Sequence, residues 1–199
     1  MGNALIKDMN VTEVEEYIKK TEYKIRQLVK DYASDIEEKL INNSKMHDFA
    51  KRAYNIREIL EYAQWTMDKK DIIHNVDLSQ RIKPRRGEIW TCQLGKNIGS
   101  EENKIRPAII IQNNTGNDRG PTTIIVPISN RPKKIATHIE IKKNDYKLVE
   151  GEKNLITGTI LCEQIKVVSK VRLGRHVATL EDDFLNDILK PKLRLSINI

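Results

Sequence analysis

Apolar side chains in the first third of the chain recur at alternating intervals of three and four residues. This spacing predicts an amphipathic helix with a coiled-coil seam. Thr12 followed three residues later by Glu15 has the spacing of a capping box, which predicts a helix start there. The seam consists of Val11, Val14, Ile18, Thr21, Ile25, Leu28 and Tyr32.

A second seam of the same kind follows the polar break at 42–44. Two amphipathic helices joined by a short turn lie antiparallel, so residues 1–80 are predicted to form a helical hairpin. Three roles stay open for this hairpin: dimerisation or another oligomeric contact, docking on the domain that follows, or covering that domain's ligand groove. The second seam consists of Phe49, Ala53, Ile56, Leu60, Ala63 and Met67.

After a polar linker that ends at Pro84, apolar and polar residues alternate in short runs. Strands are predicted at about 88–94, 106–113, 122–129, 138–141 and 159–168, with an Asn- and Gly-rich turn at 114–121. Thr179 is placed to cap a helix over 180–189. Strands at this density predict a small antiparallel barrel or sandwich over residues 81–199.

Length and composition exclude several classes of protein. The chain has 199 residues and no run of 18 apolar residues, so we expect no membrane-spanning helix. Its start lacks the apolar core of a signal peptide. Two cysteines, Cys92 and Cys162, cannot form a disulfide framework. These features favour an intracellular, cytoplasmic protein.

The positive charge lies in one part of the chain. Residues 1–83 carry 15 basic and 15 acidic side chains, whereas residues 84–199 carry 20 and 13, which accounts for the whole net charge of +7. A basic surface favours a polyanionic partner such as nucleic acid, because binding releases counterions from the phosphates. The basic part has only three aromatic residues, so a base-stacking module of the RRM or cold-shock kind is not expected.

Common catalytic motifs are absent from the sequence. Its four histidines are scattered and no CxxC pair is present, so neither a metal nor another cofactor is expected. The sequence also has no GxSxG elbow, P-loop or GxGxxG motif.

A series of short motifs in the second part of the chain resembles the MazF/PemK family of toxin endoribonucleases. The resemblance covers about residues 84–199 and keeps the order and spacing of the family. The motifs are Arg85-Arg86-Gly87-Glu88-Ile89-Trp90, Gly99-Ser100-Glu101, Arg106-Pro107, Gln112-Asn113, Pro121-Thr122, Thr137-His138-Ile139-Glu140 and Glu163-Gln164-Ile165.

The resemblance implies a fold, an activity and partners. The fold is α+β, an SH3-like antiparallel barrel of the MazF/CcdB toxin type with a C-terminal helix. The implied activity is cleavage of single-stranded RNA, mRNA included, at short sequences by way of the 2′-OH and without a metal ion. The implied partners are a second copy in a homodimer and a MazE-like antitoxin whose acidic tail occupies the RNA groove.

The resemblance also places two catalytic residues. The family's arginine falls on Arg106, and its hydroxyl residue, usually threonine, falls on Ser129. A guanidinium can donate two parallel hydrogen bonds to a phosphorane that carries extra negative charge, and a hydroxyl can donate a third. Arginine is a poor general base because its pKa lies above about 12, so Arg106 is interpreted as a stabiliser and acid, and the base stays unassigned. The alternative for Arg106 is an ion pair with Glu101 or Glu102.

Further residues are predicted to contact RNA. They come from a loop near the RNA, a late strand that reads base edges, and a loop after Ser129 that holds flanking phosphates. The alternatives are turn capping, sheet packing and plain solvation; solvent exposure is also the interpretation of Lys166, Lys170 and Arg172. The predicted RNA-binding residues are Ser100, Glu101, Glu163, Gln164, Arg131, Lys133 and Lys134.

Two other functions stay open at the level of sequence. One is a non-catalytic binding module on the same fold, such as a topoisomerase inhibitor or an inactive toxin. The other is a DNA-binding regulator that acts through the basic face. Arg106 and Ser129 in register favour the enzyme, because a binding module has no need of them.

Overall fold

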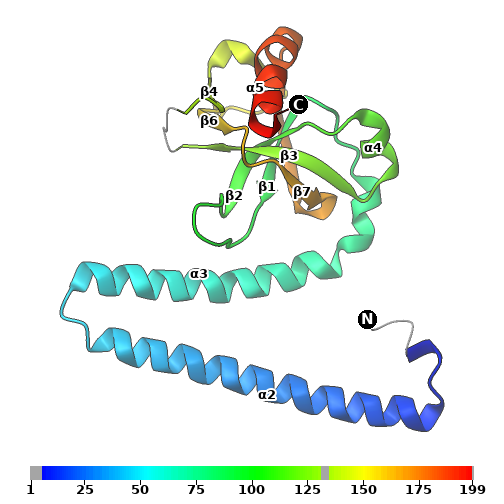
Figure 1. The fold of residues 1–199 in the computed structure, drawn as a ribbon, viewed down its shortest axis with the longest axis vertical. Helices are drawn as coiled ribbons and strands as arrows, with labels where there is room; N and C mark the ends of the chain where they lie inside the picture. The colour runs from blue at the N-terminus through cyan, green and yellow to red at the C-terminus, as the bar shows by residue number, and fades with distance from the viewer. Residues whose placement is uncertain (1–5, 131–134, 199) are drawn as a thin grey trace. The chain divides into compact units, whose positions relative to one another are not determined.

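A computed structural model describes residues 6–130 and 135–198 (Figure 1). The backbone contacts divide the chain into two compact units, Met1–Ala63 and Gln64–Ile199. Each unit is described by itself. The predicted division into 1–80 and 81–199 places the boundary later along the chain and stays a prediction.

The first unit is built on α2 (Val11–Ser44), which continues through a turn into α3 (Phe49–His74). The capping box is formed by Asn10 and Glu13, two residues before the predicted pair: the Asn10 N–H donates to Glu13 Oε2 at 2.8 Å, and the Glu13 N–H donates to Asn10 Oδ1 at 3.0 Å. Both pairs have the same spacing, and asparagine caps a helix as well as threonine does.

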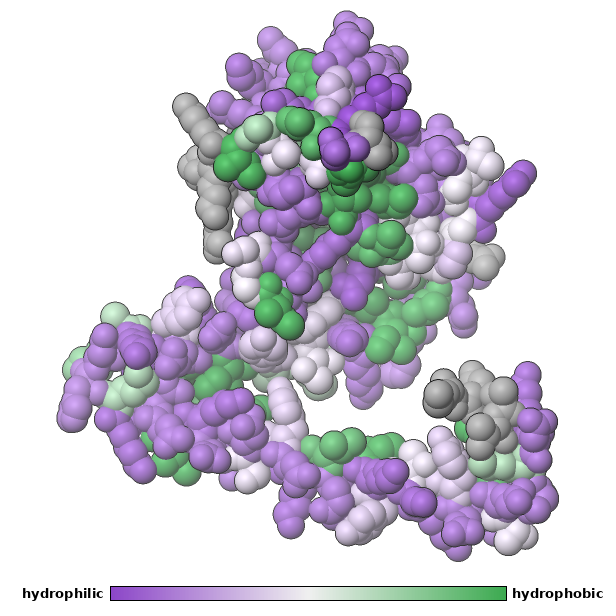
Figure 2. Space-filling view, viewed as in Figure 1, coloured by the Kyte–Doolittle hydropathy of each residue, from purple (hydrophilic) through white to green (hydrophobic). Residues whose placement is uncertain are grey.

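The apolar seam of α2 is exposed in the single chain. Leu28 keeps 67% of its surface exposed and Ile25 keeps 55%. Figure 2 shows hydrophobic side chains at the surface along the helices. The seam therefore provides little core of its own.

The described residues of the second unit form eight antiparallel strands. They follow the order β4-β6-β3-β2-β1-β8-β5, and β7 also pairs with β3. The strands are β1 (Glu88–Gln93), β2 (Ile105–Ile110), β3 (Thr122–Ser129), β4 (His138–Ile141), β5 (Tyr146–Leu148), β6 (Gly158–Leu161), β7 (Lys166–Ser169) and β8 (Leu173–Leu180).

The long strand β3 makes the sheet curl. Along one edge it pairs first with β7, from Thr122 to Ile125, and then with β6, at Ile128 and Ser129. Its other edge pairs with β2. The result is a curled antiparallel half-barrel. The prediction was an α+β, SH3-like antiparallel barrel, and this fold class is confirmed (Figure 1).

Alternating side chains of the strands form two buried clusters. The larger cluster includes Ile89, Ile109 and Val126 and is closed by Phe184 and Leu189 near the C-terminus. Full burial of each such side chain stabilises the fold by about 1.5–3 kcal/mol. The smaller cluster lies around Cys92, Leu94, Ala108, Ile110, Ile125, Val168 and Leu173.

Three local predictions were wrong. β8 runs on to Leu180, so the terminal helix begins later, with a π-helical segment η4 (Phe184–Leu189) that leads into α5 (Lys190–Ile197). The predicted turn at 114–121 contains the short helix α4 (Asn114–Arg119), which the Asn113 side chain caps. Residues 162–165 connect β6 to β7 instead of lying inside one strand.

Short 3-10 helices precede several strands: η1 (Val76–Arg81) precedes β1, and η3 (Lys170–Arg172) precedes β8. Another, η2 (Lys143–Asp145), precedes β5. Within the described ranges, no helix combines the length and the apolar character needed to cross a membrane.

Candidate functional site

The loop between β1 and β2 carries the first group of predicted site residues. Two backbone hydrogen bonds close its base: the Leu94 N–H donates to the Lys104 carbonyl at 2.8 Å, and the Lys104 N–H donates to the Gly95 carbonyl at 2.7 Å. Lys104 has a φ of 68°, the left-handed region that most side chains avoid. Inside the loop, Asn97 Nδ2 donates to the Glu102 carbonyl at 2.7 Å. These contacts fix where the loop enters β2.

Arg106 and Ser129 meet at the carboxylate of Glu102. Arg106 lies on β2 opposite Cys92, and Ser129 ends β3 opposite Thr159 of β6. Arg106 Nε donates to Glu102 Oε2 at 3.0 Å, and Ser129 Oγ donates to Glu102 Oε1 at 2.7 Å. The structure therefore brings the two predicted catalytic residues together through a third.

These three residues differ in their access to solvent. Glu102 is 7% exposed and Ser129 is 1% exposed. The Arg106 side chain keeps 26% of its surface in solvent. A buried carboxylate is costly unless it is paired, and here it is paired on both oxygens. The guanidinium is thus the part of the cluster that reaches the surface.

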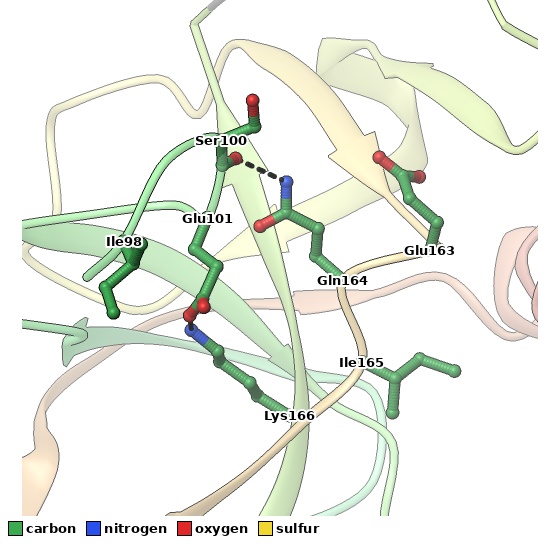
Figure 3. Close-up of a pocket in the computed structure, with 7 residues that line it drawn as sticks. All are labelled: Ile98, Ser100, Glu101, Glu163, Gln164, Ile165 and Lys166. Carbon is green, nitrogen blue, oxygen red and sulfur yellow. Dashed lines mark hydrogen bonds and ion pairs between the residues drawn. The ribbon is translucent and has the colours of Figure 1, made fainter.

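Gln164 ties the loop to the β6–β7 connection. Its Oε1 accepts the Glu102 N–H at 2.9 Å, and its Nε2 donates to the Ser100 carbonyl at 3.2 Å, as Figure 3 shows for Ser100. Both ends of the Gln164 amide are therefore used on the loop backbone. Gln164 was predicted to read base edges, and that role stays untested.

A cavity of about 400 Å³ opens beside this loop. At one end of the drawn group, Lys166 Nζ pairs with Glu101 Oε2 at 2.7 Å (Figure 3). Predicted RNA-binding residues from both the loop and the β6–β7 connection line the same cavity. The lining residues are Ile98, Ser100, Glu101, Glu163, Gln164, Ile165 and Lys166.

Glu163 belongs to a separate hydrogen-bonded group. Its Oε1 lies 2.8 Å from His138 Nε2, and its Oε2 accepts the Thr137 hydroxyl at 3.1 Å. The His138 side chain is 6% exposed. These contacts fix the Glu163 carboxylate at the rim of the cavity, against the start of β4.

The remaining basic residues divide into two groups. The predicted phosphate-binding residues Arg131, Lys133 and Lys134 lie outside the described residues. Lys170 was predicted to be exposed, and this was wrong: it is fully buried, and its Nζ donates to the Asn117 carbonyl. Burial lowers the pKa of Lys170. Lys170 is therefore a structural residue that holds α4.

The two cysteines are buried in the sheet. Desolvation raises the pKa of Cys92 and of Cys162 to about 12. Both thiols are therefore protonated at neutral pH and are poor nucleophiles. Among the described residues, no three His, Cys, Asp or Glu side chains gather as ligands of a metal ion would.

Sequence reasoning missed Glu102 as a member of the site. The resemblance pointed to Glu101, whereas Glu102 entered only as one of two ion-pair partners considered for Arg106. Because both glutamates lie in an irregular loop, their order in the sequence does not determine which one turns inward. A spacing of four residues, as between Glu102 and Arg106, predicts a side-chain contact only within a helix, so it gave no usable signal in this loop.

The curled sheet, its C-terminal helix and an arginine on β2 that pairs with a buried glutamate define a small toxin-type fold with a polar site. Residues 85–196 match the family described as "PemK-like, MazF-like toxin of type II toxin-antitoxin system". The chain belongs to this family, and the predicted membership in the MazF/PemK toxin endoribonucleases is confirmed.

Two relatives illustrate the match. The chain is 41% identical over 106 residues to "Endoribonuclease MazF" of Staphylococcus saprophyticus, which covers 52% of this chain and 83% of that protein. The crystal structure of MazF from Deinococcus radiodurans has a TM-score of 0.50 at 17% identity and covers 59% of this chain and 99% of the other. The structural likeness shows the fold, and the helices before residue 85 lie outside the family match.

Proposed function

We propose that the chain cleaves single-stranded RNA, mRNA included, at short sequences and without a metal ion, as the toxin of a type II toxin–antitoxin pair. The observation that carries the proposal is the Arg106 guanidinium, which Glu102 holds at Nε while 26% of the side-chain surface stays exposed to solvent. Family membership and 41% identity to an endoribonuclease over the same region support it.

Arg106 suits a reaction driven by the RNA's own 2′-OH. The 2′ oxygen attacks the adjacent phosphorus, the bond from phosphorus to the 5′ oxygen breaks, and the products carry a 2′,3′-cyclic phosphate and a 5′-OH. The ion pair with Glu102 uses Nε–H, one of five N–H donors of the guanidinium. The Nη donors are the group we assign to the phosphorane oxygens, where extra negative charge develops. Ser129 is assigned to the same catalytic group through its contact with Glu102.

The cavity supplies a surface for the nucleotides that flank the cleaved bond. Ser100, Glu101, Glu163 and Gln164 line it and are the residues we assign to RNA contacts there. Arg131, Lys133 and Lys134 are assigned to flanking phosphates on the basis of their charge and their position after Ser129. The part of the chain that contains the site carries the whole net charge of +7, which suits a polyanion.

The same features suit the other proposed partners. An antitoxin with an acidic tail would compete for the basic RNA surface, because both ligands carry carboxylate or phosphate oxygens toward Arg and Lys. We also propose a homodimer, and the cytoplasm as the compartment in which mRNA is met.

The test is RNA cleavage in EDTA by the wild-type protein and by Arg106→Ala. Arg175→Ala is the matched control, because Arg175 also pairs with a carboxylate, Glu152, at 2.7 Å. We expect discrete products from the wild type and the control, no products from Arg106→Ala, and protection of the RNA by 2′-O-methylation at the cut. Intact RNA with folded wild-type protein would favour the non-catalytic binding module instead.

A further inference from the structure

Glu102 is a buried acidic side chain between Arg106 and Ser129, and it makes four separate polar contacts. Its backbone is held by Gln164 at the N–H, at 2.9 Å, and by Asn97 at the carbonyl, at 2.7 Å. Its carboxylate is held by Ser129 on one oxygen and by Arg106 on the other. The side chain therefore has a single position that satisfies all its partners.

The ion pair with Glu102 restricts the conformational freedom of the Arg106 side chain. An arginine side chain has many rotamers, and ordering it costs conformational entropy. The Glu102 carboxylate removes that freedom at Nε, before any ligand binds. It thereby leaves the Nη end of the guanidinium in a fixed direction, which is what a group that stabilises a transition state requires.

Ser129 acts on the same carboxylate from the other side. Its hydroxyl has one proton to donate, and that proton is directed to Glu102 Oε1. At 1% exposure the Ser129 side chain has almost no surface for RNA to contact. Its influence on the reaction therefore passes through Glu102, in a chain that runs from Ser129 to Glu102 to Arg106.

We propose that Glu102 is a positioning residue of the RNA-cleaving site, and that the Ser129–Glu102–Arg106 chain orients the Arg106 guanidinium toward the scissile phosphate. The proposal rests on the proposed function. An unpaired carboxylate beside RNA would repel the phosphates, so the charge of Glu102 alone would not predict a role in RNA cleavage. Its pairing with Arg106 and Ser129 gives it one.

A purely structural role for Glu102 makes a different prediction. The contacts that hold the loop, from Gln164 and Asn97, reach the Glu102 backbone and survive any change of its side chain. If Glu102 only filled a buried position, glutamine and alanine would alter stability without a selective effect on the chemical step. If Glu102 orients Arg106, glutamine preserves the function because its amide oxygen still accepts from Nε.

The experiment compares full-length wild type, Glu102→Gln and Glu102→Ala on an RNA oligonucleotide that the wild type cleaves. We expect kcat to fall about 10-fold to 100-fold in Glu102→Ala, as for a small misplacement of a catalytic group, with KM nearly unchanged. Glu102→Gln should recover most of the loss. Glu152→Ala is the matched control, because its carboxylate is also largely covered and also pairs with an arginine.

An NMR signal gives a readout that does not depend on activity. The Nε–H of Arg106, assigned by its loss in Arg106→Lys, should be protected from exchange in the wild type, in Glu102→Gln and in Glu152→Ala, and should broaden in Glu102→Ala. Wild-type kcat together with a protected signal in Glu102→Ala would overturn the positioning role while leaving RNA cleavage intact. Absence of cleavage by the wild type would overturn the proposed function, and the positioning role with it. If Glu102→Ala fails to fold, a loss of kcat of about 10-fold or more in a folded Glu102→Gln would overturn the proposal, because the amide oxygen still accepts from Nε.

Discussion

Arg106 and Ser129 lie on neighbouring strands, and each donates a hydrogen bond to a different oxygen of the same carboxylate. Arg106 contacts Glu102 Oε2 at 3.0 Å, and Ser129 contacts Oε1 at 2.7 Å. The two residues are 23 positions apart in the sequence, and the pairing of β2 with β3 brings them close. The arginine and the hydroxyl residue are therefore linked through one carboxylate.

Removal of the Ser129 hydroxyl should affect both stability and cleavage. In Ser129→Ala the buried Glu102 carboxylate loses one of its two donors, and a hydrogen bond to a charged group contributes about 1.5–3 kcal/mol. We expect the free energy of unfolding in urea to fall by about this amount, and kcat to fall as well.

A matched variant tests whether the effect is specific to this carboxylate. Thr137→Val removes a hydroxyl that donates to Glu163 at 3.1 Å, at the rim of the cavity. Ser129→Ala should lower kcat more than Thr137→Val does, because only the former reaches Arg106. Equal effects on kcat would contradict the chain from Ser129 to Arg106.

Gln164 should control the mobility of the β1–β2 loop. Its amide oxygen accepts the Glu102 N–H at 2.9 Å, so Gln164→Ala frees that N–H. We expect hydrogen exchange at the Glu102 amide to become about 10-fold faster, which corresponds to about 1.4 kcal/mol. Gln112→Ala is the control, because Gln112 Nε2 donates to the Thr122 carbonyl at 3.1 Å, outside this loop. Unchanged exchange in Gln164→Ala would show that the loop is held by its own contacts at Leu94 and Lys104.

The sequence predicted the strands and the helices better than it predicted the site's inner contacts. Alternation of apolar residues is a local property, and the runs at 106–113 and 122–129 therefore became β2 and β3. The burial of Glu102 and of Lys170 depends on residues far apart in the chain, such as Gln164 and Asn117. Charged residues are predicted to be exposed when only the sequence is known, and their burial becomes evident only once the fold shows their partners.

Trp65 lies on the part of α3 that belongs to the second unit, and it packs inside that unit. Its ring lies so close over Gly95 that an added Cβ would overlap a ring carbon, and Arg172 Cζ lies 5.4 Å from the ring centroid. Gly95 also has a φ of +92°. We expect Trp65→Ala to lower the free energy of unfolding of the second unit by about 1–3 kcal/mol, from lost burial and a lost cation–π contact.

A pair of truncations tests where the toxin unit begins. If Trp65 is part of it, a chain of residues 64–199 should unfold at higher urea concentration than a chain of residues 81–199. The predicted boundary at residue 81 requires the two midpoints to agree. Trp65→Phe in the longer chain is the control, because an aromatic ring is retained over Gly95.

Cys92 should give the second unit a stability that depends on alkaline pH. Burial raises the pKa of its thiol in the folded protein from an ordinary value of 9.0 to about 12. The unfolded chain therefore loses this proton first as the pH rises, and ionisation favours the unfolded state. The contribution of the buried thiol is complete below pH 9.0 and declines as the pH approaches about 12. Urea unfolding of wild type and Cys92→Ala from pH 8 to pH 11 separates this effect from that of other groups that titrate at alkaline pH. The stability difference between the two proteins should change by about 1.4 kcal/mol for each pH unit above the unfolded pKa.

A thiol reagent at pH 8 gives the matching kinetic test, because Cys92 and Cys162 should react only after unfolding. Rapid labelling of the folded protein at either cysteine would contradict the buried, protonated state.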